Sequence, residues 1–418
     1  MTRGFVQELM DSPINQLRAL ITAIVPGNKF YTRRLAADGV TGSNLQSLED
    51  FAARVSFTRK QDLVGDQAAH PLYGSNLTYP LDRYTRFCQT TGTTGRPLIW
   101  LDTQESWDGL LENWGQIYRA ARVGPGDRIY FAFSFGPFLG FWTAFEAAAA
   151  LGVLSLPGGG LSSVARLQAL ISNQANVLLC TPTYALHLAE VASSAGIDLA
   201  ESVVAKIIVA GEPGGSLPSV RERISKAWNG AQVIDHYGMT EVGPVTFQDP
   251  VVESVQRIVA DSYYAEVIDP LTGASAASGT VGELVLTPLR RLGMPLLRYR
   301  TGDLVRACTD AQGLALRGGI LGRADDMIVV RGVNLYPSAI DAVVRLLPEI
   351  TEYRVRVARP SGTMAEVELE IESVDDGAAS KLQLAFSQAF SLRIPVRSVG
   401  ANTLPRFEFK ARRWLIQE

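Results

Sequence analysis

Short apolar runs alternate with segments of helical periodicity through the middle of the chain. In chain order, runs and helical segments occupy residues 128–133, 138–151, 153–156, 161–172, 177–180, 184–195, 206–210, 217–228 and 232–235. Short buried strands joined by helical crossovers predict a parallel sheet that is covered by helices. Because ligands bind such sheets at the carboxyl ends of the strands, the loops that follow residues 210 and 235 are candidate binding segments.

The pattern differs on both sides of this region. Residues 1–80 carry helical periodicity between polar turns, for example at 14–25 and 45–54, and we interpret them as packing helices without candidate chemistry. An amphipathic helix is predicted at 103–121. From residue 258 the chain turns to strands and turns, which are predicted at 264–268, 282–287 and 297–299 and indicate a β-rich subdomain.

The last part of the chain predicts a small α+β domain. It holds an expected strand, a helix, two strands and a second helix, at 328–330, 337–346, 353–357, 366–371 and 378–393. A unit of roughly 90 residues fits a domain of its own. The predicted fold is therefore α/β, with a large N-terminal domain of helix-covered sheets plus a β-rich subdomain, followed by a small α+β C-terminal domain.

A threonine- and glycine-rich segment separates two expected strands, 84–88 and 98–101. Residues 89–97 read Q-T-T-G-T-T-G-R-P. The glycines allow successive N–H groups to converge on an anion, and threonine hydroxyls and a guanidinium add donors, which favours a triphosphate cradle. The spacing is not that of a Walker A loop, since a strand follows instead of a helix. A polar hairpin turn is the alternative interpretation.

Composition narrows the class of protein. The chain has 418 residues, a formal charge of -3 and 47% hydrophobic residues, enough for more than one domain. The small negative charge without a basic run argues against nucleic acid as a partner. Its cysteines, Cys88, Cys180 and Cys308, are widely spaced within apolar runs. With no signal-peptide core and no apolar stretch of membrane length, we expect a cytoplasmic protein that does not engage a membrane.

Five segments together resemble the adenylate-forming enzymes, which include acyl- and aryl-CoA ligases. They are T-T-G-T-T-G-R-P at 90–97, Y-G-M-T-E at 237–241, Y-R-T-G-D-L at 299–304, G-R-A-D-D-M-I-V-V-R-G-V-N at 322–334 and L-P-R-F-E-F-K-A-R-R at 404–413. The resemblance covers roughly residues 80–418. The Gly-Glu-Pro loop at 211–213 and G-V-N-L-Y-P at 332–337 look most like the phenylacetate-CoA ligase branch.

The resemblance implies a two-step reaction that uses ATP, Mg²⁺ and coenzyme A. A carboxylate attacks the α-phosphate to give acyl-AMP and pyrophosphate, and a thiol then displaces AMP. The implied ATP and AMP contacts are Thr90, Thr91, Gly92, Thr93, Thr94, Gly95, Arg96, Glu212, Pro213, Tyr237, Gly238, Met239, Thr240, Asp303 and Arg323. Many relatives have lysine where Arg96 stands, and a guanidinium binds phosphate with a different geometry.

Individual roles follow from the same resemblance. Glu241 is expected to bind Mg²⁺, and Thr240 to donate to the α-phosphate. Tyr237 is expected to offer a flat face to adenine, and Asp303 to accept hydrogen bonds from the ribose hydroxyls. Glu212 and Pro213 look like the adenine-side wall, and Arg323 like a ribose or phosphate contact. Outside this motif, each would be interpreted as an ordinary loop or turn residue.

The C-terminal domain is expected to carry the catalytic cation. By resemblance, the ammonium of Lys410 bridges the carboxylate oxygen and the α-phosphate, where charge is greatest in the transition state. The alternative is that Lys410 is one solvated member of the basic cluster formed with Arg406, Arg412 and Arg413. Asp325 falls on the family's hinge position. The expected domains are therefore 1–322 and a mobile 326–418, joined by a hinge near 323–325.

The acid pocket is expected beside the phosphate loop. Its implied residues are Tyr130, Phe133, Phe135, Gly136, Phe138, Ala210, Gly211 and Gly238. Aromatic side chains with glycine gaps suit a flat ring better than an alkyl chain, although any single phenylalanine could instead be ordinary core. With no cationic residue standing out in this set, we expect an aromatic acid whose tail is neutral, such as benzoate, a hydroxy- or aminobenzoate, or phenylacetate.

Further expectations concern a structural metal, the acceptor thiol, the activity and the oligomeric state. Residues 247–261 contain no Cys or His, so no structural zinc is expected. The acceptor thiol could belong to coenzyme A or to the phosphopantetheine arm of a carrier protein. A catalytically silent nucleotide-binding protein is the alternative from another class. We expect a monomer or homodimer.

Overall fold

The computed structural model describes residues 12–90, 97–310, 312–324, 328–330, 333–358, 366–406 and 413–417. Residues 91–96 of the threonine- and glycine-rich loop, the hinge candidate Asp325 and the lysine candidate Lys410 lie outside these ranges. Among the described residues, no helix is long and apolar enough to span a membrane.

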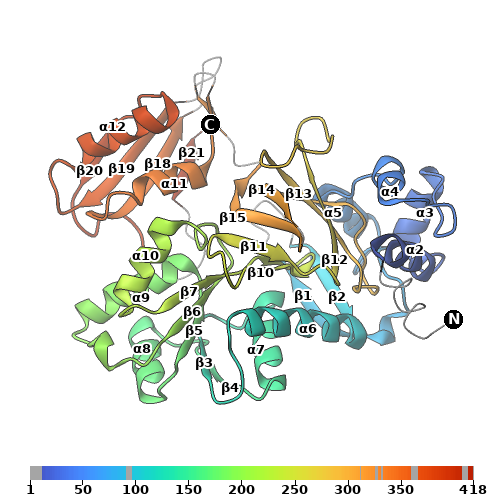
Figure 1. Ribbon diagram of the computed structural model, residues 1–418, viewed down its shortest axis with the longest axis horizontal. Helices are drawn as coiled ribbons and strands as arrows, with labels where there is room; N and C mark the ends of the chain where they lie inside the picture. The colour runs from blue at the N-terminus through green and yellow to red at the C-terminus, as the bar shows by residue number, and fades with distance from the viewer. Residues whose placement is uncertain are drawn as a thin grey trace.

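A parallel sheet of five strands lies among helices at one end of the larger body (Figure 1). In spatial order its strands are β4 (Leu154–Pro157), β3 (Arg128–Phe131), β5 (Val177–Cys180), β6 (Lys206–Val209) and β7 (Gln232–Asp235). Every neighbouring pair is parallel, which confirms the prediction from the alternating pattern.

Helices cover both faces of this sheet because side chains on each strand alternate between the faces. On β3, Phe131 packs into one apolar cluster with α6 (Gln104–Ala120) and α7 (Leu139–Ala150). Its neighbour Tyr130 packs into another, with the helices α8 (Ser163–Ser172), α9 (Pro182–Ser194) and α10 (Pro218–Ala227). Each helix begins or ends within two residues of its predicted bounds.

The threonine- and glycine-rich segment stands between the two strands of one antiparallel pair. The pair consists of β1 (Tyr84–Gln89) and β2 (Ile99–Thr103), and Gln89 lies opposite Ile99 in the register. Thr90 closes the neck of the loop, because its N–H donates to the Leu98 carbonyl and its Oγ1 accepts from the Leu98 N–H, each at 3.0 Å. The predicted strands are thus present on both sides of the segment.

A second sheet has six antiparallel strands. In spatial order they are β10 (Thr246–Gln248), β11 (Val255–Ile258), β15 (Gly313–Arg323), β14 (Tyr299–Asp310), β13 (Val281–Pro288) and β12 (Tyr263–Ile268). The predicted strand at 297–299 is wrong, since β14 begins only at Tyr299. Arg298 has a positive φ of 45°, and its N–H donates to Thr287 Oγ1 instead of to a ladder partner.

Four N-terminal helices pack against this second sheet (Figure 1). They are α2 (Pro13–Ile24), α3 (Lys29–Ala37), α4 (Leu48–Arg54) and α5 (Lys60–Ala69). Short 3₁₀ turns at Leu81–Arg83 and Leu199–Glu201 and a two-stranded hairpin of β8 (Gly238–Met239) with β9 (Gly243–Pro244) complete the larger body. The hairpin carries the Y-G-M-T-E segment.

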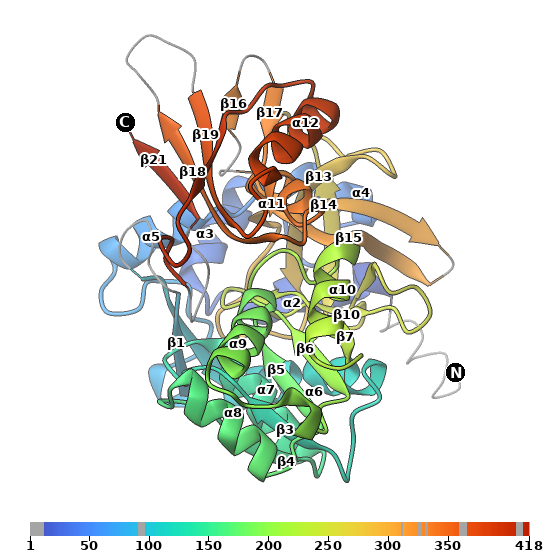
Figure 2. The same ribbon diagram turned by 90° about the vertical axis from the view of Figure 1, so that its left-hand side faces the viewer.

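The C-terminal domain has a core of its own. Its sheet runs β20 (Val396–Val399), β19 (Glu366–Ser373), β18 (Ile350–Ala358) and β21 (Trp414–Gln417), with helices α11 (Pro337–Val344) and α12 (Ala378–Phe390) and a hairpin of β16 (Ile328–Val330) and β17 (Val333–Leu335). Figures 1 and 2 show this domain beside α9 and α10 of the larger body.

Candidate active site

Tyr237 and Asp303 meet although 66 residues separate them. Tyr237 follows β7 and Asp303 lies on β14, and the Tyr237 hydroxyl donates to Asp303 Oδ2 at 2.6 Å. Arg323 of β15, the register partner of Asp303, donates to Oδ1 at 3.2 Å. Burial, reinforced by the adjacent Asp303 charge, raises the pKa of Tyr237 well above its usual value, so this tyrosine stays a neutral donor. The structure therefore brings together three of the predicted nucleotide residues.

Glu241 lies in the turn between β8 and β9 and is 4% exposed. The Lys60 ammonium is 3.3 Å from its Oε1. Burial, together with the Glu241 charge, raises the pKa of Tyr299 well above its usual value. Lys60 is the first residue of α5, so one of the N-terminal helices that were interpreted as packing helices also contacts a predicted site residue. The sequence could not reveal this contact, because nothing local links α5 to a turn so far along the chain.

The donor set around Glu241 fits magnesium on a nucleotide. Among the described residues, no three His, Cys, Asp or Glu side chains lie together as a protein-made metal cage would require. Mg²⁺ usually takes one or two protein carboxylates and fills its remaining positions with phosphate oxygens and water. The single buried carboxylate of Glu241 is consistent with that arrangement.

A buried ion pair contacts the backbone of the same turn. The Arg291 guanidinium forms two 2.6 Å hydrogen bonds to the carboxylate of Asp102 on β2. Its Nη1 donates to the carbonyls of Thr240 and Glu241, each at 2.9 Å. Neither Asp102 nor Arg291 is among the site residues predicted from the sequence. The available signal was a charged residue at the end of an apolar strand, Asp102, and a second one, Arg291, within an apolar segment.

Asp235 and His236 form a second buried polar group, also missed by the sequence analysis. The Asp235 carboxylate accepts hydrogen bonds from the Ser216 hydroxyl, the Gln256 amide and the His236 N–H. Burial raises the pKa of Asp235 to about 6 despite these donors. Burial also lowers the pKa of His236 to about 4. Together they fix the end of β7 from which the Tyr237 loop departs.

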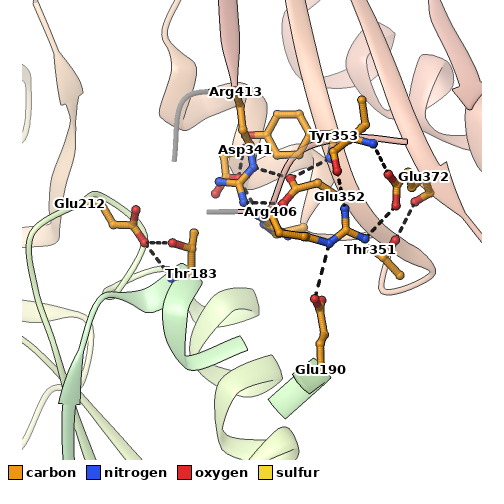
Figure 3. A network of polar contacts seen from close by, with 12 residues as sticks. Thr183, Glu190, Glu212, Asp341, Thr351, Glu352, Tyr353, Glu372, Arg406 and Arg413 are labelled. Atoms are coloured by element: carbon orange, nitrogen blue, oxygen red, sulfur yellow. Dashed lines mark hydrogen bonds and ion pairs between the residues drawn. The ribbon is translucent and has the colours of Figure 1, made fainter. Parts of the chain in front are cut away.

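The Gly-Glu-Pro loop is tied to the start of α9 (Figure 3). Gly211 turns the chain with φ of 91°, and Glu212 Oε1 accepts from the N–H and the hydroxyl of Thr183 at 2.7 and 2.6 Å. Pro213 is exposed. This anchoring holds the loop at the carboxyl end of β6, and the adenine-side role of Glu212 and Pro213 stays a prediction.

Aromatic side chains gather where β3 ends. Phe133 stacks on Phe141 with ring centroids 3.9 Å apart, and Phe135 makes edge contacts with Trp142 and Phe145. The remaining members of the predicted pocket, Gly136, Phe138, Ala210 and Gly238, are half-buried at strand ends and loops, and Gly211 is exposed. Tyr130 is the exception, since it packs on the opposite face of the sheet with α8 and α9.

This aromatic group lies close to two segments that are predicted to contact the nucleotide, the threonine- and glycine-rich loop and the Y-G-M-T-E segment. The N–H of Gln89, just before the threonine- and glycine-rich loop, donates to the Pro137 carbonyl at 2.7 Å. Leu139, the first residue of α7, shares an apolar cluster with Tyr237, and α7 packs against β8 and β9. Segments that are far apart in sequence therefore converge at one end of the parallel sheet.

The chain on both sides of residues 407–412 is held by carboxylates (Figure 3). Arg406 donates to Glu372 at 2.8 Å within its own domain and lies 3.7 Å from Glu190 of α9. Arg413 donates to both oxygens of Glu352, at 2.6 and 3.1 Å. The chain that enters and leaves the Lys410 segment is thus fixed at the boundary between the two bodies.

Comparison with known proteins identifies the class. The family model described as AMP-binding enzyme matches residues 80–287, and the AMP-binding enzyme C-terminal domain matches residues 332–416. The chain is 32% identical to the phenylacetate-coenzyme A ligase of Thermus thermophilus, over 89% of this chain and 82% of that protein. It belongs to the family of AMP-binding, adenylate-forming enzymes. The expected resemblance and fold class are confirmed.

Within this family the chain is an AMP-forming acid–thiol ligase, a class that uses ATP, Mg²⁺ and coenzyme A. It is also similar to the phenylacetate-coenzyme A ligases of Pseudomonas putida, at 29% identity over 98% of this chain and 94% of that protein, and of Escherichia coli, at 27% over 97% and 94%.

A solved 2-hydroxyisobutyryl-CoA ligase is similar to this chain over its whole length, to a degree that depends on its state. In its postadenylation state with an acyl-adenylate it superposes with a TM-score of 0.91, at 28% identity, covering 100% of this chain and 90% of that one. In its thioesterification state with CoA, the TM-score is 0.73 at 30% identity with the same coverage. The C-terminal domain therefore lies here as it does in the postadenylation state.

Proposed function

We propose that this ligase activates an aromatic carboxylic acid of the benzoate, aminobenzoate or phenylacetate type and transfers it to coenzyme A. The observation that carries this proposal is the aromatic group of Phe133, Phe135 and their neighbours, joined to the start of the phosphate loop by the hydrogen bond from Gln89 to Pro137. Rings favour offset or edge contacts with other rings, so this wall suits a planar substrate.

The nucleotide would be held along the line from Glu212 to Asp303. Asp303 keeps carboxylate lone pairs for ribose hydroxyls, while Tyr237 and Arg323 fix its orientation through their hydrogen bonds. The adenine would lie between the Gly-Glu-Pro loop and Tyr237. The hydroxyl of Thr240 would donate to the α-phosphate, and the residues of 91–96, with Arg96, would hold the outer phosphates.

In the first step a substrate carboxylate oxygen attacks the α-phosphorus and the bond to the bridging oxygen of pyrophosphate breaks. Charge on the α-phosphate oxygens is largest in the transition state, so fixed donors there lower the barrier. Lys410 would supply one of these donors from the C-terminal domain, and Glu241 would hold Mg²⁺, which neutralises phosphate charge when bound. In the second step the CoA thiol loses its proton, attacks the acyl carbon and releases AMP.

We further propose that the boundary between the two domains lies near Asp325. We assign residues 1–322 to acid and ATP binding and 326–418 to the mobile domain. Two conformations of the similar 2-hydroxyisobutyryl-CoA ligase, one with an adenylate and one with CoA in the thioesterification state, support a rotation between the half-reactions.

The experiment is acid-dependent pyrophosphate release over a panel of aromatic acids, followed by thioester formation. Benzoate, aminobenzoates and phenylacetate are compared with octanoate and 2-hydroxyisobutyrate at equal concentration, and free CoA is compared with a phosphopantetheinylated carrier protein. We expect an aromatic acid to give the highest kcat/KM, and CoA to accept the acyl group. No release with any acid would favour a silent nucleotide-binding protein.

A small branched acid is the second candidate. The ligase that superposes with a TM-score of 0.91 carries a 2-hydroxyisobutyryl adenylate, whose acyl group is compact and not planar. The two candidates are separated by Phe135→Leu, which shortens the aromatic wall. That variant should lower kcat/KM for a ring substrate about tenfold or more through lost contact, whereas activity on a small branched acid should change little.

A further inference from the structure

Arg291 is an almost fully buried cation, 2% exposed, and its partner Asp102 is 0% exposed. The guanidinium uses Nε and Nη2 for the carboxylate and Nη1 for the carbonyls of Thr240 and Glu241. Its carbon lies 5.1 Å from the centre of the Trp100 ring, which lies on the same face of β2 as Asp102. The guanidinium thus has hydrogen-bond partners at Nε, Nη1 and Nη2 and an aromatic ring near its carbon.

The partners of Arg291 belong to two segments that are predicted to contact the nucleotide phosphates or adjoin residues that do. Asp102 lies on β2, the strand that leaves the threonine- and glycine-rich loop. Thr240 and Glu241 form the turn that carries the magnesium-binding carboxylate. An arginine fork fixes direction as well as distance, because its donors lie in one plane.

We propose that Arg291 and Asp102 are positioning residues that hold Glu241 in the geometry required for Mg²⁺ on the nucleotide. With both carbonyls directed at the guanidinium, the backbone of the turn that carries Glu241 is held in place, while the Glu241 carboxylate is not used by Arg291 and has the Lys60 ammonium 3.3 Å from its Oε1. Groups that orient a metal ligand typically change metal affinity or activity by 10- to 100-fold when they are removed. This inference rests on the proposed role of Glu241. It goes beyond that role because it assigns a positioning function to Arg291 and Asp102.

The test uses a double variant that removes the charges without leaving one of them buried alone. Replacing a buried ion pair by apolar residues of similar size is often neutral for folding, so Asp102→Leu with Arg291→Met should fold while losing both carbonyl contacts. Arg291→Lys is the conservative companion. An ammonium can reach the carboxylate but cannot reproduce the planar fork.

Two measurements separate positioning from general stability. The first is calorimetric binding of α,β-methylene-ATP as a function of Mg²⁺ concentration, which needs no acid and no turnover. The second is the split between KM for Mg²⁺ and kcat in pyrophosphate release. We expect the double variant to need about 10- to 100-fold more Mg²⁺ for half-maximal binding, with Arg291→Lys intermediate and urea unfolding still cooperative.

The matched control is a buried ion pair remote from the nucleotide. Arg257 lies on β11, next to an edge strand of the six-stranded sheet, and donates to Asp249 and Asp310. Arg257→Met with Asp249→Leu should leave the Mg²⁺ dependence unchanged. The proposal is overturned if the folded Asp102/Arg291 double variant matches wild type in this dependence. If that variant does not unfold cooperatively, a wild-type Mg²⁺ requirement in Arg291→Lys overturns the proposal. Failure to find any acid substrate would leave the calorimetric result standing.

Discussion

The Tyr237 hydroxyl lies 2.6 Å from Asp303 Oδ2 and joins the loop after the last parallel strand to the antiparallel sheet. Because Asp303 is only 7% exposed, its carboxylate relies on protein donors for orientation as well as for solvation. A short hydrogen bond between a neutral hydroxyl and a buried carboxylate is among the stronger protein hydrogen bonds. The two residues should therefore act on the nucleotide as one unit.

Tyr237→Phe deletes this donor and keeps the ring. A hydrogen bond to a charged group is worth about 1.5–3 kcal/mol, so we expect AMP affinity to fall about tenfold or more. Calorimetric titration with AMP measures the change. The control is Tyr118→Phe, whose hydroxyl donates to the Ala144 carbonyl in the core at 2.7 Å and whose loss should lower stability alone. Equal AMP affinity in wild type and Tyr237→Phe would contradict the assignment.

Asp235 and His236 should oppose each other in the pH dependence of stability. Burial raises the pKa of Asp235 from 3.8 to about 6, so its stabilising contribution is full below pH 3.8 and is lost as the pH rises through about 6. Burial lowers the pKa of His236 from 6.5 to about 4, so its contribution is full above pH 6.5 and is lost as the pH falls through about 4. Each shift corresponds to about 3 kcal/mol, with opposite sign over the same pH range.

Replacing one member of this pair should reveal the effect of the other on the pH dependence of the free energy of unfolding. In Asp235→Asn, the free energy of unfolding should drop by about 3 kcal/mol relative to wild type between pH 6.5 and 4. In His236→Gln it should drop relative to wild type as the pH rises from 4 to 6. Urea unfolding at closely spaced pH values gives both curves. Variant curves that run parallel to the wild-type curve would show that neither group titrates as described.

The elements were predictable where packing depends on local pattern. The strand–helix alternation from Arg128 to Asp235 fixed the parallel sheet, because each strand needs two covered faces and each helix has one apolar stripe. The prediction failed at Leu297–Arg298, where the N–H groups donate to the side chains of Tyr31 and Thr287. Such tertiary hydrogen bonds leave no periodic signal in the sequence.

The candidate site was predictable only in part. Tyr237, Asp303 and Arg323 stand in recognisable motifs, and the structure brings them into contact. Arg291 and Lys60 do not, since each meets the Thr240–Glu241 turn through folding of distant elements. A charged residue in an apolar segment indicates burial and a partner, but the sequence alone does not say which partner.

The contact between Glu190 and Arg406 should have a small effect on the relative rates of the two half-reactions. The two side chains are 44% and 27% exposed and 3.7 Å apart, so the pair contributes about 1 kcal/mol at most. Glu190→Gln should therefore lower adenylation relative to thioester formation by less than about fivefold, and the difference should vanish in high salt. Half-reaction rates at low and high ionic strength measure this. Glu105→Gln, which removes the surface partner of Arg83, is the control. A larger, salt-insensitive effect would require another role for Glu190.

Lys410 provides the sharpest separation of the two half-reactions. If its ammonium meets the α-phosphate only while the C-terminal domain is in its present position, Lys410→Ala should reduce acid-dependent pyrophosphate release by about 100-fold or more, the size expected for removing a transition-state donor. Thioester formation from supplied acyl-AMP should stay within about threefold of wild type, since the domain then presents another face. The control is Lys381→Ala, an exposed lysine of the same domain paired with Asp375 at 2.6 Å, which should leave both rates unchanged. Equal loss of both half-reactions in Lys410→Ala would contradict the assignment, whereas two unchanged rates would be expected of a solvated lysine.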